Sequence, residues 1–272
     1  MFSKLVEMFS YPFIWRAALV GVLVSLSAAL LGVSLVLKRF SMIGDGLSHI
    51  GFGALALATA LGFAPLAVSI PIVVAAAFLL LRIGDNGKLK GDSAIALISC
   101  GALALGVVIL SFSSSNNVDI TNYLIGSILA VTETDAVISV ILSLSVICVY
   151  LLFYSRIFSV TFDENFAKAT GVRTDASNML IALLSALTIV IGMRLVGSML
   201  ISALIIFPPL SSMRVFGSFK SVVICSGILS VVCFLIGICA SFLLSTPAGA
   251  SVVCVNIIAY LIFAAVGKIK RG

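Results

Sequence analysis

An acidic residue and the only histidine of the chain stand four positions apart at the start of an apolar stretch. Asp45 and His49 lie within RFSMIGDGLSHIGFGALALATALG, residues 39–62. Residues four apart on a helix share one face, so the carboxylate and the imidazole would point into the same space. Ionisable groups inside membrane segments are costly and mark pathways for ions or substrates. Because oxygen and nitrogen ligands suit a divalent transition metal, the pair predicts metal passage through a membrane.

Spacing alone leaves a second interpretation of this pair open. Ser41 could cap the helix, and Asp45 in the first turn would then complement the helix dipole. This interfacial role explains the acid but not the histidine one turn deeper. Two protein ligands are also too few for a stable zinc site, which normally has four. A transport site must release its ion, so an incomplete ligand set fits transit better than storage.

The composition predicts an all-α, polytopic membrane protein. Of the 272 residues, 62% are hydrophobic and 10% are charged, and the mean hydropathy is +1.32; soluble domains carry about 25% charged residues. A spanning helix needs about 20 apolar residues. About nine such segments cover residues 13–37, 42–62, 65–82, 94–112, 136–155, 177–193, 196–213, 220–244 and 249–267. Only Arg194 and Leu195 separate the sixth segment from the seventh, so eight spans are also possible.

The basic residues predict the orientation of these spans. With nine spans, all 16 lysines and arginines except Lys4, Arg16 and Arg194 fall on one side. The positive-inside rule then places the N-terminus outside and the C-terminus in the cytoplasm. An eight-span arrangement would break this agreement. The net charge of +6 is therefore an orientation signal and not the mark of a nucleic-acid partner.

Three connections between the segments are more than turns, and the first, IGDNGKLKGDS at 83–93, reads as a flexible cytoplasmic link. The outward-facing stretch at about 113–135 contains YLIGSIL, which is too short to span and predicts a re-entrant or interfacial helix. The cytoplasmic insertion at about 156–176 reads as a short amphipathic helix that starts at Thr161 or Asp163 and ends at Gly171. Phe162 and Phe166 supply its apolar side, and exposed apolar residues on a cytoplasmic helix indicate a protein partner.

Several motifs are absent, and two other features have plain structural interpretations. No GxxxxGK[ST], HExxH or GxSxG sequence occurs, so we expect a transport subunit and not an enzyme, with energy supplied by another subunit or an ion gradient. The six cysteines stand singly in apolar runs and are interpreted as small hydrophobic residues. Pro208 and Pro209 predict a break in the seventh segment, most simply a kink.

At four stretches, in order, the chain resembles the permeases of the zinc, manganese and iron class of ABC transporters. The stretches are LKRFSMIGDGLSHIGFGALALA, NYLIGSILAV, FDENFAKATGV and VGSMLISALIIFPPLSSMR. The resemblance extends over essentially the whole chain. It departs from the family where SHIGFGALALA replaces SH followed by a Leu–Pro–Gly or Leu–Leu–Gly element, which leaves the Asp–His pair intact but weakens any choice of metal.

The resemblance implies a single permease domain, residues 1–272, in a bacterial cytoplasmic membrane. Asp45 and His49 match the residues proposed to contact the metal in the translocation path. The helix that docks on the cytoplasmic ATPase is matched by Asp163, Glu164, Phe166, Ala167 and Gly171. The implied assembly pairs two permeases with two ATP-binding subunits, and an extracytoplasmic protein delivers the metal. No permanent cofactor is expected; the transported ion is zinc by preference, with manganese next.

Two other functions remain open from the sequence. A proton-coupled secondary transporter could use the same Asp–His pair without any ATPase. A non-transporting membrane subunit of a larger complex would use the 161–171 helix for binding only. These alternatives differ in whether metal uptake requires a partner ATPase.

Overall fold

The computed structural model describes residues 12–40, 42–86, 91–112 and 133–271, and every regular element in them is an α-helix. The all-α prediction is therefore confirmed for the described residues. The outer stretch predicted to be re-entrant lies almost wholly outside them, at 113–132. The helices are α2 (Pro12–Leu37), α3 (Ile43–Ala60), α4 (Pro65–Asn86), α5 (Gly91–Phe112), α7 (Glu133–Leu152), α8 (Tyr154–Phe162), α9 (Glu164–Ala169), α10 (Thr174–Val196), α11 (Ser198–Val215), α12 (Phe219–Leu244) and α13 (Ala248–Arg271).

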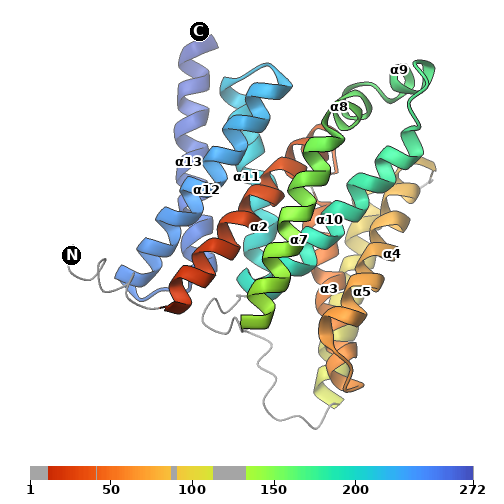
Figure 1. The fold of residues 1–272 in the computed structure, drawn as a ribbon, viewed down its shortest axis with the longest axis vertical. Coiled ribbons are helices and arrows are strands. Elements are labelled where there is room, and N and C mark those ends of the chain that lie inside the picture. Colours follow the sequence, from red (N-terminus) through yellow and green to blue (C-terminus); the bar gives the residue numbers. More distant parts are fainter. Residues whose placement is uncertain (1–11, 41, 87–90, 113–132, 272) are drawn as a thin grey trace.

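The long helices lie side by side as one tilted bundle, and the short helices α8 and α9 sit at the end that holds the C-terminus (Figure 1). Helix α2 is central, since it contacts α7, α10, α11 and α12. Helices α11, α12 and α13 pack together on one flank, and α3, α4 and α5 pack together on the other. The helix with the Asp–His pair therefore belongs to the second flank and touches α10 and α11 along the inner side.

Six of the described helices are long and apolar enough to cross a membrane, which supports a protein with several spans. A seventh is possible if α7 and α8, which bend by 69° at Phe153, form one span. Helix α3 is not among the six because it carries polar residues, and α4 contributes only the shorter apolar stretch Pro65–Leu80. The predicted nine spans and the orientation of the termini stay predictions. The six are Ile14–Leu37, Ser93–Phe112, Thr174–Met193, Ser198–Val215, Phe219–Leu244 and Ala248–Lys270.

The two segments that the sequence barely separates are distinct helices. Gly197 alone divides α10 from α11, and its φ of 94° belongs to a region that side-chain-bearing residues rarely enter. Helix α11 runs as one helix through Pro208 and Pro209, so these residues do not divide the segment, and the predicted kink stays a prediction. Pro209 cannot donate to the carbonyl of Ile205, and that carbonyl packs against Gly32 of α2, where a Cβ would lie only 2.1 Å from its oxygen.

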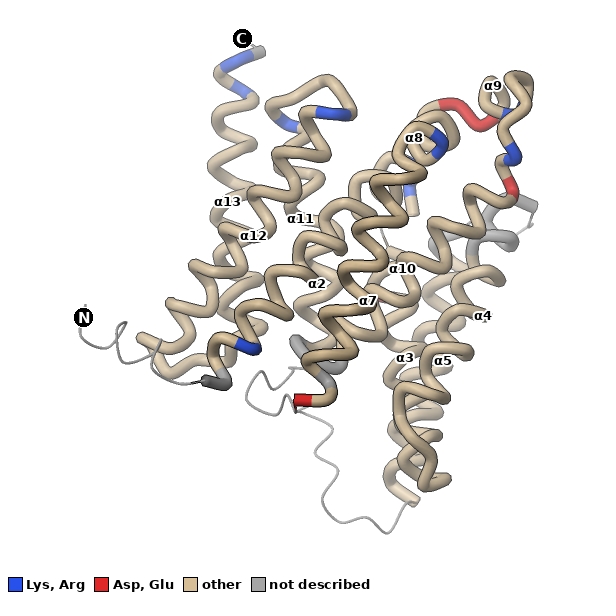
Figure 2. Tube along the Cα trace, viewed as in Figure 1, with Lys and Arg blue, Asp and Glu red and all other residues tan. Residues whose placement is uncertain are grey.

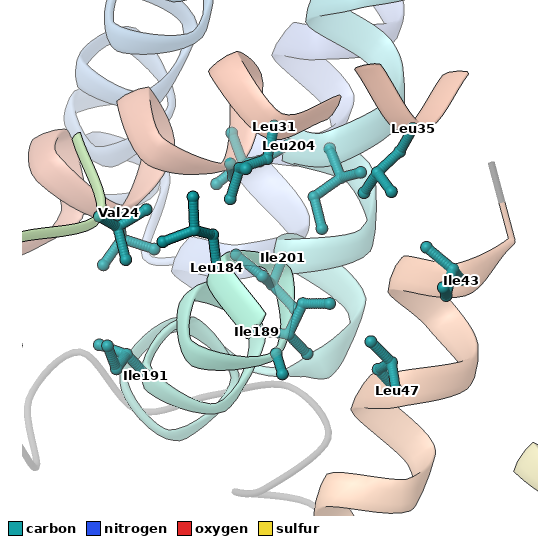
Figure 3. Packing of buried hydrophobic residues seen from close by; sticks show 14 of the residues in the cluster. Val24, Leu31, Leu35, Ile43, Leu47, Leu184, Ile189, Ile191, Ile201 and Leu204 are labelled. Atoms are coloured by element: carbon teal, nitrogen blue, oxygen red, sulfur yellow. The ribbon is translucent and has the colours of Figure 1, made fainter. Parts of the chain in front are cut away.

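The core lies where α2, α3, α10 and α11 meet. Leucine and isoleucine side chains from all four helices interdigitate there (Figure 3). Ile43 and Leu47 of α3 are completely buried in this cluster, which fixes the first two turns of α3. Large apolar residues point outward on the flanks instead, as expected for helices that face lipid; examples are Leu105, Ile141, Ile228 and Leu261.

The two ends of the bundle differ in their charged residues. Figure 2 shows the described lysines and arginines gathered at the end with the C-terminus and α9, while the long middle of the bundle is almost free of charge. The exception is Arg16 in the first turns of α2, which forms an ion pair with Glu133 at the start of α7. This distribution is the one that the positive-inside rule relates to the cytoplasmic side.

Candidate functional site

The predicted pairing of Asp45 with His49 is present in α3. Asp45 lies in the first turn, His49 lies one turn later, and His49 Nε2 is 3.4 Å from Asp45 Oδ2. The imidazole is 23% exposed and the carboxylate 41% exposed, so both side chains can be reached. The 3.6-residue period of the helix is sufficient to bring them together. A carboxylate oxygen and an imidazole nitrogen thus share one accessible space.

A third polar side chain from another helix joins this pair. Ser202 Oγ of α11 lies 3.5 Å from Asp45 Oδ1 and 3.0 Å from the Ser198 carbonyl oxygen, and these two acceptors share its single hydroxyl proton. Ser202 is buried, so its hydroxyl contacts the carboxylate on the side away from solvent. Nothing in the sequence around Ser202 marks it as part of the site. No spacing signal could have found it, because it lies 157 residues away in the chain.

The histidine has one ring nitrogen without a protein partner. His49 Nδ1 is buried and makes no hydrogen bond within the part of the chain that the structure describes. Nor do the described residues contain any group of three or more His, Cys, Asp or Glu side chains that could hold a metal ion. The donor set of the described chain is thus one carboxylate and one imidazole, fewer than a structural zinc site uses. Such a set is suited to a brief contact with a cation.

Close helix packing positions α3. Gly53 lies so near α5 that a Cβ would stand 2.6 Å from the carbonyl oxygen of Ala102. Small residues at such contacts let two helix backbones approach within a membrane. Gly53 is therefore a close-packing residue between α3 and α5. Ser41, the predicted cap of this helix, lies outside the described residues, and Met42 at the N-cap position makes no side-chain capping bond.

The cytoplasmic insertion forms two helices where the sequence predicted one. Thr161 and Phe162 end α8, and Asp163 is the N-cap of α9, with Oδ1 accepting a hydrogen bond from Phe166 N at 2.9 Å. Of the two predicted starting residues, Asp163 is correct and Thr161 is wrong. Gly171 ends the turn as predicted: with φ at 84°, its N–H bonds to Lys168 O while Val172 N bonds to Ala167 O, a Schellman motif.

The two phenylalanines of this segment do not share one apolar side. Phe162 belongs to α8 and packs against Phe158 and Phe219, with ring centroids 5.1 and 5.9 Å away. Phe166 belongs to α9 and is 63% exposed. The change of direction at Asp163, whose backbone is extended, separates their faces. Ala167 is completely buried, so it fixes the inner side of α9 against the rest of the protein.

A polar network joins α9 to the ends of α2 and α10. Lys38 Nζ lies 3.3 Å from Glu164 Oε2 and also donates to Asn178 Oδ1. Asn178 Nδ2 in turn donates to Glu164 Oε1 over 2.9 Å. The Lys38 side chain is only 11% exposed, so its charge is largely withdrawn from water and held by these two partners. Helix α9 is therefore tied both to α2 and to α10.

Comparison with known proteins gives consistent matches over the whole chain. Residues 10–267 match the model of the ABC 3 transport family. The membrane protein ZnuB of a high-affinity zinc uptake system of Buchnera aphidicola is 32% identical over 89% of this chain and 93% of its own length. MntC, a membrane protein of a manganese transport system of Halalkalibacterium halodurans, is 27% identical over 92% and 85%. The solved structure of PsaBC from Streptococcus pneumoniae matches with a TM-score of 0.87 and 27% identity over 97% and 95%.

Proposed function

The chain belongs to the ABC 3 transport family, and on that premise we propose that it is the permease subunit of an ATP-driven importer of divalent metal ions. The similar proteins are membrane proteins of zinc and manganese transport systems. The observation that carries the proposal is the accessible Asp45–His49 pair, held at the inner side of the bundle in a chain with several membrane-crossing helices. Zinc is the preferred ion and manganese the next.

The pair acts as a temporary ligand set. A passing cation takes one oxygen from Asp45 and one nitrogen from His49, and it keeps water on its remaining positions. Ser202 holds the second carboxylate oxygen through its hydroxyl and so orients the carboxylate. A site with two protein ligands releases its ion more readily than a complete one, as transport requires.

Helix α9 receives the motion of a cytoplasmic ATP-binding subunit. Its exposed Phe166 supplies the apolar contact, while Asp163 and Gly171 fix the two ends of the helix. Two permeases and two ATP-binding subunits form the transporter. A metal-binding protein docks on the opposite side of the membrane.

The proposed topology has nine spans in a bacterial cytoplasmic membrane. The cation-rich end of the bundle, with α9 and the C-terminus, faces the cytoplasm. Helices α3 and α4 complete the spans, although α3 carries polar residues and α4 offers only the shorter apolar stretch Pro65–Leu80. Their inner position supports this role, because α3 is covered by α4, α5, α10 and α11.

Metal accumulation in cells tests the proposed site. The Asp45→Ala/His49→Ala double variant is expected to abolish uptake of zinc and manganese while the protein still reaches the membrane in normal amount. Thr59→Ala is the matched control, since it removes a polar group from the same helix, where its hydroxyl bonds only Leu55 O. Normal uptake by the double variant would disprove the role of the pair.

Co-purification tests the proposed docking helix. Phe166→Asp is expected to release the ATP-binding subunit from the purified permease. Phe112→Asp, an exposed phenylalanine at the far end of α5, is the control and should retain it. A secondary transporter would keep metal uptake after Phe166→Asp and lose it with an uncoupler. A non-transporting subunit would show no uptake at all in the unaltered protein.

A further inference from the structure

A cavity of about 600 Å³ opens beside the bend between α7 and α8. It is bounded by α8, by the connection from α9 to α10, and by the first two turns of α10. None of the residues in the proposed metal path lines it. The lining residues are Phe153, Arg156, Thr170, Gly171, Val172, Arg173, Ala176, Ser177 and Leu180.

Two arginines from different elements give the cavity a positive charge. Arg156 comes from α8, and Arg173 precedes α10. Neither guanidinium forms an ion pair with any residue that the structure describes. Arg156 instead lies over the ring of Phe153, 5.3 Å from its centroid. Two unneutralised guanidinium groups around one cavity favour an anion, and phosphate oxygens fit their geometry well.

The start of α10 adds to this preference. Ser177 N is the first amide of α10 with an intrahelical partner, the carbonyl of Arg173. The amides of the preceding turn point out of the helix end, and the N-cap residue Arg173 offers them no side-chain acceptor. The helix dipole is positive at this end, so it attracts a negative group in the cavity. The acid of this turn, Asp175, does not line the cavity.

The rest of the lining is apolar and continues onto the outer surface of the bundle. Phe153, Val172 and Leu180 form the apolar part of the wall. Leu151 and Leu152 at the end of α7 directly precede Phe153 and are 59% and 80% exposed. The cavity therefore lies where the lipid-facing surface meets the cation-rich end. A ligand that fits both parts is an amphiphile with an anionic head.

We propose that this cavity binds the headgroup of an anionic phospholipid. The phosphate lies between Arg156 and Arg173, and the glycerol end lies against Phe153 with the acyl chains toward Leu152. Basic pockets between membrane helices on the cytoplasmic side recognise anionic lipids in this manner. An acidic side chain of a partner protein would satisfy the arginines but would leave the apolar wall uncovered. The proposal does not depend on the metal path.

Lipid titration of the purified full-length chain tests the proposal. Thermal unfolding in detergent is followed while short-chain phosphatidylglycerol, short-chain phosphatidylcholine or inorganic phosphate is added. We expect stabilisation by phosphatidylglycerol only. The Arg156→Gln/Arg173→Gln variant is expected to bind it about 25-fold more weakly, roughly fivefold for each arginine removed. The Arg156→Lys/Arg173→Lys variant keeps both charges and should retain most of the effect.

Lys220→Gln/Lys268→Gln is the matched control. Both lysines are exposed at the same end of the bundle and neither lines the cavity, so their loss should not change lipid binding. Equal stabilisation by phosphatidylglycerol and phosphatidylcholine would overturn the proposal. So would equal affinity of the arginine variant and the lysine control variant for phosphatidylglycerol. Stabilisation by inorganic phosphate alone would show an anion site without lipid recognition. Loss of ATP-binding subunit with unchanged lipid binding in the arginine variant would assign the cavity to that partner instead.

Discussion

Lys38, the residue after α2, lies 3.3 Å from Glu164, the first residue of α9. This contact connects the proposed docking helix to the central helix of the bundle. The chain runs from Lys38 through a short turn into α3, where Asp45 and His49 stand. On the proposed function, we expect a displacement of α9 to reach α2 and the start of α3 through this contact. Asn178 of α10 is the third member of this network, since its side chain bonds to both Lys38 and Glu164.

Removing the lysine should separate the docking helix from the bundle. Lys38→Met is expected to lower the free energy of unfolding by about 1–2 kcal/mol, because a largely buried charge pair loses one partner. It should also leave ATP hydrolysis in the assembled transporter while metal uptake falls. The charge-reversed Lys38→Glu/Glu164→Lys variant should recover part of both losses. Chemical denaturation, ATPase activity and uptake measure these three effects.

The Arg16–Glu133 pair is the control for this experiment. It joins two helices at the other end of the bundle, but its side chains are 42% and 76% exposed. An exposed pair contributes little, so Arg16→Met should cost less than about 1 kcal/mol and should leave uptake unchanged. Equal effects of Lys38→Met and Arg16→Met would contradict a special role for the Lys38 contact.

The approach of α3 to α5 makes Gly53 sensitive to any side chain. A Cβ at this position would lie 2.6 Å from the carbonyl oxygen of Ala102, so Gly53→Val must push the two helices apart. We expect a clear loss of folded protein, measured as detergent-stable monodisperse material and as Tm. Gly101→Val on α5 is the control, because no atom lies within 4 Å of a Cβ there. A normal Tm for Gly53→Val would show that the helices can separate without cost.

Ser202 should affect metal affinity without being a ligand. Its hydroxyl bonds to Asp45 over a long 3.5 Å, and removal of an outer-shell partner typically costs about 10-fold or more in metal affinity. Because the bond is long, Ser202→Ala is expected to raise the KM for metal uptake by about 10-fold at most, with unchanged expression. Ser241→Ala serves as the control, because the Ser241 hydroxyl donates to Thr246 O, far from the Asp45–His49 pair. An unchanged KM would mean that Asp45 is oriented by other contacts.

The N-cap of α9 should decide how well the docking helix forms. Asp163→Ala removes the bond to Phe166 N and is expected to cost about 1 kcal/mol of local stability. It should weaken co-purification of the ATP-binding subunit. Asp163→Ser restores a capping oxygen and should restore binding. If serine failed where alanine failed, the negative charge of Asp163, and not the cap, would be the important feature.

The sequence by itself determined the features that depend on local rules. The helical period placed Asp45 beside His49. The preferences of aspartate for N-caps and of glycine for positive φ located the two ends of α9 at Asp163 and Gly171. The apolar segments gave the all-helical architecture, since backbone groups in lipid must be satisfied within a helix.

Only the tertiary structure decided the contacts between distant segments. Ser202 reaches Asp45 because α11 packs against α3, and no local pattern encodes that approach. The sequence places Phe162 on the same face as Phe166, but in the structure Phe162 ends α8 and packs on Phe219 of α12, and the extended backbone of Asp163 separates it from α9. Lys38 looked like one orientation signal among many. Folding withdrew it from water beside Glu164 and Asn178, where a charge is kept only if its partners lie close.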